Sequence, residues 1–234
     1  MVRSEKKIGL MGGTFDPVHN GHLHLAKEAQ KFLDLESVLF IPAFRSPHKL
    51  ELEPETCEHR VSMLGLAIEN QPGFSMDRIE INKQAVSYTI ETLEKLKAGH
   101  PDWNMFLILG ADAFLAIDTW KDCTKLLDFC NILVGTRPGV AFEIPESIKN
   151  KLSLAEPEKF SPSLKKETES KVLENQKNGT QVIFFKIPLL DISSKDIRQR
   201  IMKKEEIKNL LPPSVDHYIM KHRLYRDDSP PKVA

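Results

Sequence analysis

The sequence has little cysteine, no excess of charge of either sign and no long apolar run. Its three cysteines, Cys57, Cys123 and Cys130, form no C-x-x-C pair. This argues against a zinc site or disulfide framework and favours a reducing, cytoplasmic location. Lys plus Arg and Asp plus Glu both total 33, so no bulk positive field indicates nucleic acid or an anionic membrane as a partner. The first apolar run breaks at Gly12-Gly13 and no later run approaches a membrane span, so neither a signal peptide nor a transmembrane helix is expected.

What the chain does have is an alternation of β-rich apolar runs with segments of helical periodicity. Strands are predicted over residues 6–13, 37–43, 74–82, 103–112, 131–139 and 180–188. Helices are predicted over residues 21–34, 57–70, 87–99, 113–120, 121–130, 193–206 and 212–225. This order favours an α/β fold, a Rossmann-like doubly wound parallel sheet with helices on both faces.

Two segments break the alternation. Residues 141–178 are rich in Lys, Glu, Ser and Pro, and we interpret them as a surface insertion that is partly helical or mobile. Residues 227–234 are expected to form a flexible tail. Residues 1–226, with this insertion included, are expected to form a single domain.

Polar clusters follow several of the predicted strands. They occupy residues 12–22, 42–49, 110–112, 136–139 and 191–198. In a parallel α/β sheet, ligands bind beyond the carboxyl ends of the strands. The clusters therefore predict one composite site at that edge of the sheet.

The first cluster reads "GGTFDPVHNGH" over residues 12–22. Gly12 and Gly13 allow a ligand to approach the backbone, and the next helix would direct its free N–H groups at a phosphate. Protonated His19 and His22 would add contacts to phosphate oxygens. The alternative is a tight turn with surface histidines. A zinc site that includes His24 lacks the one-turn spacing and the glutamate of metal-binding helices.

The later cluster "ISSKDIR", residues 192–198, has similar chemistry. Ser193 and Ser194 can cap a helix and donate hydroxyls to an anion, and Arg198 can reach a phosphate with a planar fork. Lys195 places a positive charge at a helix N-terminus, where the helix dipole disfavours a cation. A lysine in this unfavourable position indicates a phosphate ligand nearby. The alternative is an ordinary serine N-cap with Asp196 in the first turn.

These two motifs together resemble the nucleotidyltransferase superfamily with the T/H-x-G-H signature. Within it, the chain is similar over nearly its whole length to bacterial nicotinate-mononucleotide adenylyltransferases. The resemblance also rests on "PHK" at 47–49, "SYTIETL" at 87–93, "LGADAF…W" at 109–120 and "GTRPG" at 135–139. It implies transfer of AMP from ATP to nicotinate mononucleotide, with Mg²⁺ held by ATP rather than by the protein.

The resemblance also implies roles for individual residues. The catalytic residues would be His19, His22 and Arg198. ATP would be bound by Gly12, Gly13, Thr14, Phe15, Arg137, Ser193 and Ser194. The mononucleotide would be bound by His48, Lys49, Tyr88, Thr89, Gly110, Asp112 and Trp120. Lys195 replaces the usual threonine, and the 141–178 insertion exceeds the usual connector.

Two other kinds of function compete with this one. A sister enzyme would use another acceptor, such as nicotinamide mononucleotide alone or alongside the acid, or phosphopantetheine. Trp120 and "SYT" argue against phosphopantetheine, which has no pyridine to stack. A nucleotide-sensing module would bind without turnover, and the intact His19, His22 and Arg198 argue against it. The sequence leaves the oligomeric state open, a homo-oligomer included.

Overall fold

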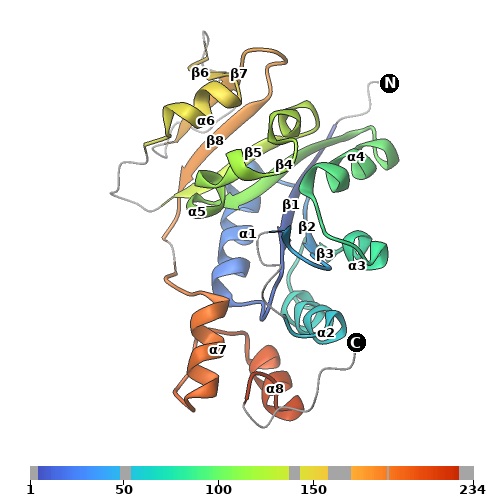
Figure 1. Ribbon diagram of the computed structural model, residues 1–234, viewed down its shortest axis with the longest axis vertical. Coiled ribbons are helices and arrows are strands. Elements are labelled where there is room, and N and C mark those ends of the chain that lie inside the picture. The colour runs from blue at the N-terminus through green and yellow to red at the C-terminus, as the bar shows by residue number, and fades with distance from the viewer. Residues whose placement is uncertain (1–4, 48–53, 137–142, 158–169, 189, 227–234) are drawn as a thin grey trace. The chain divides into compact units, whose positions relative to one another are not determined.

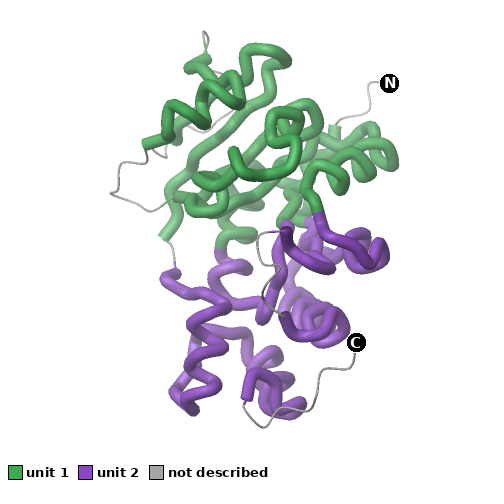
Figure 2. The backbone as a smooth tube through the Cα atoms, in the orientation of Figure 1, with its two compact units in different colours: residues 1–11, 25–38, 88–189 green, residues 12–24, 39–87, 190–234 purple. Residues whose placement is uncertain are grey.

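A computed structural model describes residues 5–47, 54–136, 143–157, 170–188 and 190–226. The chain forms two compact units, shown in different colours in Figure 2. Unit 1 comprises residues 1–11, 25–38 and 88–189. Unit 2 comprises residues 12–24, 39–87 and 190–234. The division runs along the first two strands and the first helix, which contribute residues to both units.

The described residues form one eight-stranded sheet in the order β3-β2-β1-β4-β5-β8-β7-β6 (Figure 1). The strands are β1 (Lys6–Gly13), β2 (Ser37–Pro42), β3 (Phe74–Met76), β4 (Trp103–Gly110), β5 (Asn131–Thr136), β6 (Leu154–Ala155), β7 (Lys171–Asn175) and β8 (Gln181–Lys186). The pairs β1–β4, β4–β5 and β5–β8 are parallel. The chain leaves β1 toward β2 and leaves β4 in the opposite direction toward β5. Right-handed crossovers in opposite directions place helices on opposite faces, which confirms the doubly wound prediction.

Unit 1 holds the central strands and their covering helices. Its helices are α4 (Thr89–Gly99), α5 (Ala111–Leu115), α6 (Glu146–Lys151), the 3₁₀ turns η2 (Ile117–Thr119) and η3 (Cys123–Asp128), and most of α1 (Asn20–Leu33). The β5 residues Ile132, Leu133 and Val134 are completely buried. An unbroken apolar run of this kind is typical of a parallel strand covered on both faces.

Unit 2 holds α2 (Cys57–Ile68), α3 (Ile79–Lys83), α7 (Ser194–Met202) and α8 (Pro213–His222). Helices α2 and α8 pack together through their apolar faces. Thr56 caps α2 by accepting a hydrogen bond from the N–H of His59 at 3.4 Å. Pro213 stands in the first turn of α8, where its missing N–H is not needed. No described helix is long and apolar enough to cross a membrane.

The strand predicted over residues 74–82 is wrong beyond its start. Strand β3 ends at Met76 and α3 begins at Ile79. The Asp77 carboxylate accepts a hydrogen bond from the Ile79 N–H at 2.8 Å. This local turn starts a helix where the alternating pattern suggested a continuing strand.

The insertion also differs from its prediction. Its helical part is confirmed by α6, but β6 and β7 were not expected. Strand β7 pairs antiparallel with β8, and β6 pairs antiparallel with β7 at the edge of the sheet. The turn between β7 and β8 contains Asn178 and Gly179, the latter with φ of 75°. Asn-Gly between two strands is a strong hairpin pattern. It indicates this connection, whereas the charged residues around it suggested an irregular surface segment. The tail predicted over 227–234 lies outside the described residues.

Candidate active site

The loop between β1 and α1 is shaped by a buried phenylalanine. A Cβ on Gly13 would lie 3.0 Å from the Phe15 ring, so a side chain there would press on that ring. Phe15 is 2% exposed, and its ring meets the edge of His22 at 5.1 Å between centroids. The Phe15 side chain therefore supports His22 from the core, and only its backbone can reach a ligand. A Cβ on Gly12 would meet nothing within 4 Å, so that side of the strand end is open.

The two histidines lie against each other. Their rings stack with centroids 3.6 Å apart, and the His19 main-chain N–H donates to Nδ1 of His22 at 3.2 Å. A Cβ on Gly21 would lie 3.0 Å from Nδ1 of His19, so the glycine of H-x-G-H makes room for this stack. Because Nδ1 of His22 accepts, its Nε2 carries the hydrogen and can donate to an anion.

His19 is deeply buried and uncharged. Burial lowers the pKa of His19 to about 4, so the ring is neutral near pH 7. The sequence-based expectation of a protonated His19 is wrong for the free protein, because desolvation disfavours the imidazolium. Its Nδ1 is a buried polar atom that has no hydrogen-bond partner within the described part of the chain.

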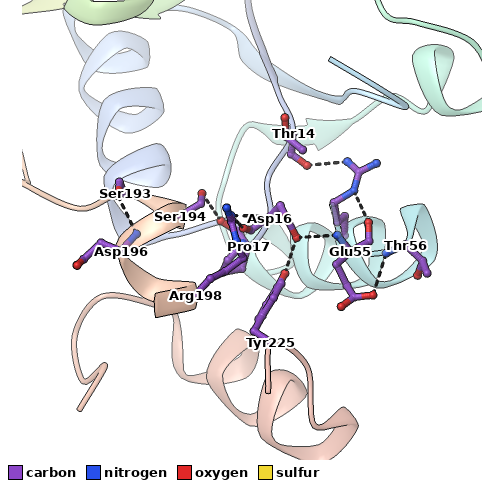
Figure 3. Close-up of polar contacts among 11 residues, drawn as sticks. Thr14, Asp16, Pro17, Glu55, Thr56, Ser193, Ser194, Asp196, Arg198 and Tyr225 are labelled. Carbon is purple, nitrogen blue, oxygen red and sulfur yellow. Dashed lines mark hydrogen bonds and ion pairs between the residues drawn. The ribbon is translucent and has the colours of Figure 1, made fainter. Parts of the chain in front are cut away.

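The second motif docks on this loop (Figure 3). The Ser194 hydroxyl donates to the Pro17 carbonyl at 2.9 Å. Nη1 of Arg198 donates to the Asp16 carbonyl at 2.5 Å and lies 3.6 Å from its carboxylate. The structure thus places Arg198 against Asp16, on the loop that leads to His19 and His22, within unit 2.

The two serines have local partners that the sequence did not reveal. The Ser193 hydroxyl accepts a hydrogen bond from the Asp196 N–H at 3.0 Å and is the N-cap of α7. Since the proton of Ser194 is directed to Pro17, that hydroxyl ties α7 to the loop. Lys195 is exposed in the first turn of α7.

Sequence analysis missed a buried set of polar residues that holds the loop from behind. Arg60 is fully buried, and its guanidinium donates to the carbonyls of Thr14, Glu55 and Phe44 at 2.6, 3.0 and 3.1 Å. Asp16 is 6% exposed. One signal in the sequence could have revealed this set: Arg60 lies on the apolar face of α2, beside buried Met63 and Leu64. Charged residues are almost never fully buried unless they are paired.

Unit 1 carries a second group of predicted residues. Tyr88 is the N-cap of α4 and Thr89 its first residue, with no side-chain cap on that turn. Lys121 follows the half-buried Trp120, donates to Glu91 at 2.7 Å and lies 4.4 Å from the centre of the Tyr88 ring. The loop after Trp120 is thereby tied to the first turn of α4.

The other predicted residues of unit 1 lie at the end of β4. Gly110 is the N-cap of α5, and Asp112 is exposed in the first turn of that helix. His48, Lys49 and Arg137 lie outside the described residues. Within the described ranges, no three His, Cys, Asp or Glu side chains group as metal ligands. The zinc alternative for His19, His22 and His24 therefore gains no support from the geometry.

Known proteins resemble this chain over nearly its whole length. The cytidylyltransferase-like family matches residues 10–200. A probable nicotinate-nucleotide adenylyltransferase of Geotalea daltonii is 38% identical over 223 residues, which cover 94% of this chain and 99% of that protein. A protein of the same description from Thermoanaerobacter sp. is 36% identical over 228 residues, covering 97% and 98%.

Solved structures support the fold. The nicotinic acid mononucleotide adenylyltransferase of Plasmodium falciparum, complexed with NaAD, aligns with a TM-score of 0.68 and 21% identity. The alignment covers 94% of this chain and 97% of that one. At this identity the likeness carries the fold and not the details of the site.

Proposed function

The chain belongs to the cytidylyltransferase-like family and, within it, to the nicotinate-nucleotide adenylyltransferases, and we propose that it transfers the adenylyl group of ATP to nicotinate mononucleotide. A phosphate oxygen of the mononucleotide attacks the α-phosphorus of ATP. The bond from that phosphorus to the β-phosphate oxygen breaks, giving nicotinate adenine dinucleotide and pyrophosphate, a step of NAD biosynthesis. Positioning and charge neutralisation supply the catalysis, so no protein nucleophile is needed.

One observation supports this assignment most strongly: α7 docks on the loop that carries the stacked histidines, through Arg198 and Ser194. We assign ATP phosphate contacts to Nε2 of His22 and to the Arg198 guanidinium, with His19 at their side. The exposed Gly12 and the backbone of Gly13, Thr14 and Phe15 would line the path of the phosphates. The N-termini of α1 and α7 belong to the same unit and favour anions.

The residues of unit 1 would take the acceptor. Trp120 would stack on the pyridine ring, and Asp112, after Gly110, would bind a ribose hydroxyl. The main-chain N–H groups at the start of α4 would receive the nicotinate carboxylate beside Tyr88 and Thr89. By resemblance, His48 and Lys49 would hold the mononucleotide phosphate, Arg137 would lie toward ATP, and Ser193 would add a hydroxyl.

Enzymes of this kind use a divalent metal with ATP. We propose that the metal is Mg²⁺, bound to the phosphate oxygens and water, because Mg²⁺ is commonly held by substrate phosphates and its own waters. We further propose a single working domain over residues 1–226. The free cysteines Cys57, Cys123 and Cys130 suit a reducing compartment, so we place the enzyme in the cytoplasm.

The test is pyrophosphate release by the purified full chain with Mg·ATP and each candidate acceptor. We expect turnover with nicotinate mononucleotide and a product with the mass of the deamido dinucleotide. Faster turnover with nicotinamide mononucleotide would assign the chain to the sister activity. ATP binding without pyrophosphate release from any acceptor would instead indicate a sensing module.

A further inference from the structure

A tyrosine near the end of the described chain reaches the loop that carries the histidines (Figure 3). Tyr225 lies three residues beyond α8, and its hydroxyl donates to Oδ1 of Asp16 at 2.8 Å. The main-chain N–H of Glu55 donates to the same oxygen at 3.2 Å. Asp16 itself is buried, so these donors replace water on one side of its carboxylate.

The other side of the carboxylate faces Arg198. Oδ2 of Asp16 lies 3.6 Å from Nη1 of Arg198, and that same nitrogen donates to the main-chain carbonyl of Asp16. The Arg198 side chain is 28% exposed, so part of it remains open to a ligand. Asp16 therefore sets the direction of the guanidinium, and Tyr225 sets the direction of Asp16.

The backbone conformation after α8 places Tyr225 against Asp16. Arg223 ends the helix in the left-handed conformation with φ of 53°, and Leu224 is buried and donates its N–H to the Ile219 carbonyl at 3.1 Å. Tyr225 is also left-handed, with φ of 62°. Such residues are disfavoured without glycine, so local contacts must hold this turn in place.

We propose that Tyr225 is a positioning residue that holds Arg198 in the orientation needed for the ATP phosphates. This rests on the proposed function for the identity of the ligand. Without the hydroxyl, Oδ1 of Asp16 keeps one donor, and the carboxylate can turn and form a two-point pair with Arg198. That pair would draw the guanidinium away from phosphate.

The environment of Tyr225 keeps its hydroxyl in the form that this role requires. Burial, followed by the neighbouring Asp16, raises the pKa of Tyr225 well above its usual value. The hydroxyl thus keeps its proton and remains a donor over the pH range in which the enzyme would work.

The test compares Tyr225→Phe with Tyr218→Phe in the full chain. Tyr218 is a matched control, because it is also a half-buried tyrosine of unit 2 and its hydroxyl lies 3.0 Å from Nδ1 of His59, away from the loop. We expect Tyr225→Phe to weaken Mg·ATP binding, measured by calorimetry, and to lower kcat by about two- to tenfold. The KM for nicotinate mononucleotide should stay at the wild-type value, and Tyr218→Phe should leave all three quantities unchanged.

A double-mutant cycle separates positioning from a general structural role. If Tyr225 acts through Arg198, adding Tyr225→Phe to Arg198→Lys should cause a much smaller further loss than it causes alone. Independent, multiplying effects would overturn the proposal, as would equal losses in the two tyrosine variants or no loss in Tyr225→Phe. If the wild type binds Mg·ATP but does not use nicotinate mononucleotide, the proposed function fails while the binding comparison still decides the role of Tyr225. A wild type that does not bind Mg·ATP would overturn both.

Discussion

The imidazole of His19 lies stacked on that of His22, with the ring centroids 3.6 Å apart and the His19 main-chain N–H bonded to Nδ1 of His22. The hydrogen bond fixes the tautomer of His22, and the stack fixes the plane of its ring. Gly21 permits both, because a side chain there would press on His19. The H-x-G-H spacing therefore orients the His22 ring so that its Nε2–H can donate a hydrogen bond.

Replacing His22 by alanine should lower kcat by about a hundredfold to a thousandfold, because a preorganised donor to developing phosphate charge is lost. The fold should persist, since His22 is only half-buried. Steady-state pyrophosphate release measures the effect, and circular dichroism checks the fold.

His24→Ala is the matched control for His22→Ala. It removes the other imidazole of α1, for which we propose no role in the reaction. Its kcat should stay within a factor of about two of wild type. Wild-type turnover in His22→Ala, or equal losses in both variants, would refute the role given to His22.

Buried His19 predicts a pH-dependent stability. Its pKa is lowered from 6.5 to about 4 by burial, so below pH 6.5 the unfolded chain takes up a proton that the folded chain refuses. The free energy of unfolding must therefore fall as the pH drops from about 6.5 toward about 4. Between about pH 7.5 and about pH 5, wild type should lose roughly 2 kcal/mol more than His19→Gln, measured by urea unfolding. Parallel pH profiles of the two proteins would show that His19 titrates normally.

The features that the sequence predicts depend on neighbouring residues, whereas the features that it does not predict depend on contacts between residues far apart in the chain. Apolar runs such as β4 and β5, and the glycines beside His19, are local patterns, and they predicted the sheet and the loop correctly. The support of the loop by Arg60 and Tyr225 depends on which distant carbonyl or carboxylate each side chain meets. The partners of Asp16 come from residues 55, 198 and 225, which lie far from it in the sequence. No spacing in the sequence encodes such contacts.

Arg60 should be essential for stability because its fork holds three main-chain carbonyls. Arg60→Lys keeps the charge but cannot reproduce the fork, and it should lower the free energy of unfolding by about 3 kcal/mol. Arg78→Lys is the control, since Arg78 is exposed in the same unit, and it should change stability by less than about 0.5 kcal/mol. Similar urea midpoints for the two variants would contradict the buried network.

Lys195 is expected to attract ATP from the first turn of α7. Lys195→Glu should raise the KM for ATP by about two- to fivefold at low salt, and the effect should shrink as salt increases. Glutamate suits a helix N-terminus, so the variant should not lose thermal stability. Lys203→Glu, at the C-cap of the same helix, is the control. Equal KM values in the two variants would mean that Lys195 serves only as a solvated surface charge.

Acceptor choice should be decided at the start of α4. Nicotinate carries a carboxylate where nicotinamide carries a neutral amide, and a helix N-terminus offers donors and partial positive charge. The buried Ser87 hydroxyl accepts a hydrogen bond from the Phe44 N–H at 3.0 Å, and we assign it no contact with the acceptor. We predict that kcat/KM favours the acid mononucleotide by about tenfold or more, which corresponds to at least ~1.4 kcal/mol.

Thr89→Pro tests this prediction, because it removes one N–H from the first turn without disturbing the helix. Proline is well tolerated at the first helical position, and Tyr88 already has the extended backbone, φ −108° and ψ 125°, that a residue before proline requires. Thr89→Pro should reduce the acid-to-amide ratio, whereas Thr89→Val keeps the N–H, loses the hydroxyl and should preserve the ratio.

Trp120→Ala should weaken both acceptors equally, because it removes stacking that they share. An equal kcat/KM for the two acceptors in wild type would contradict the acid preference, and a ratio lowered equally by the proline and valine variants would transfer the selectivity to the hydroxyl of Thr89.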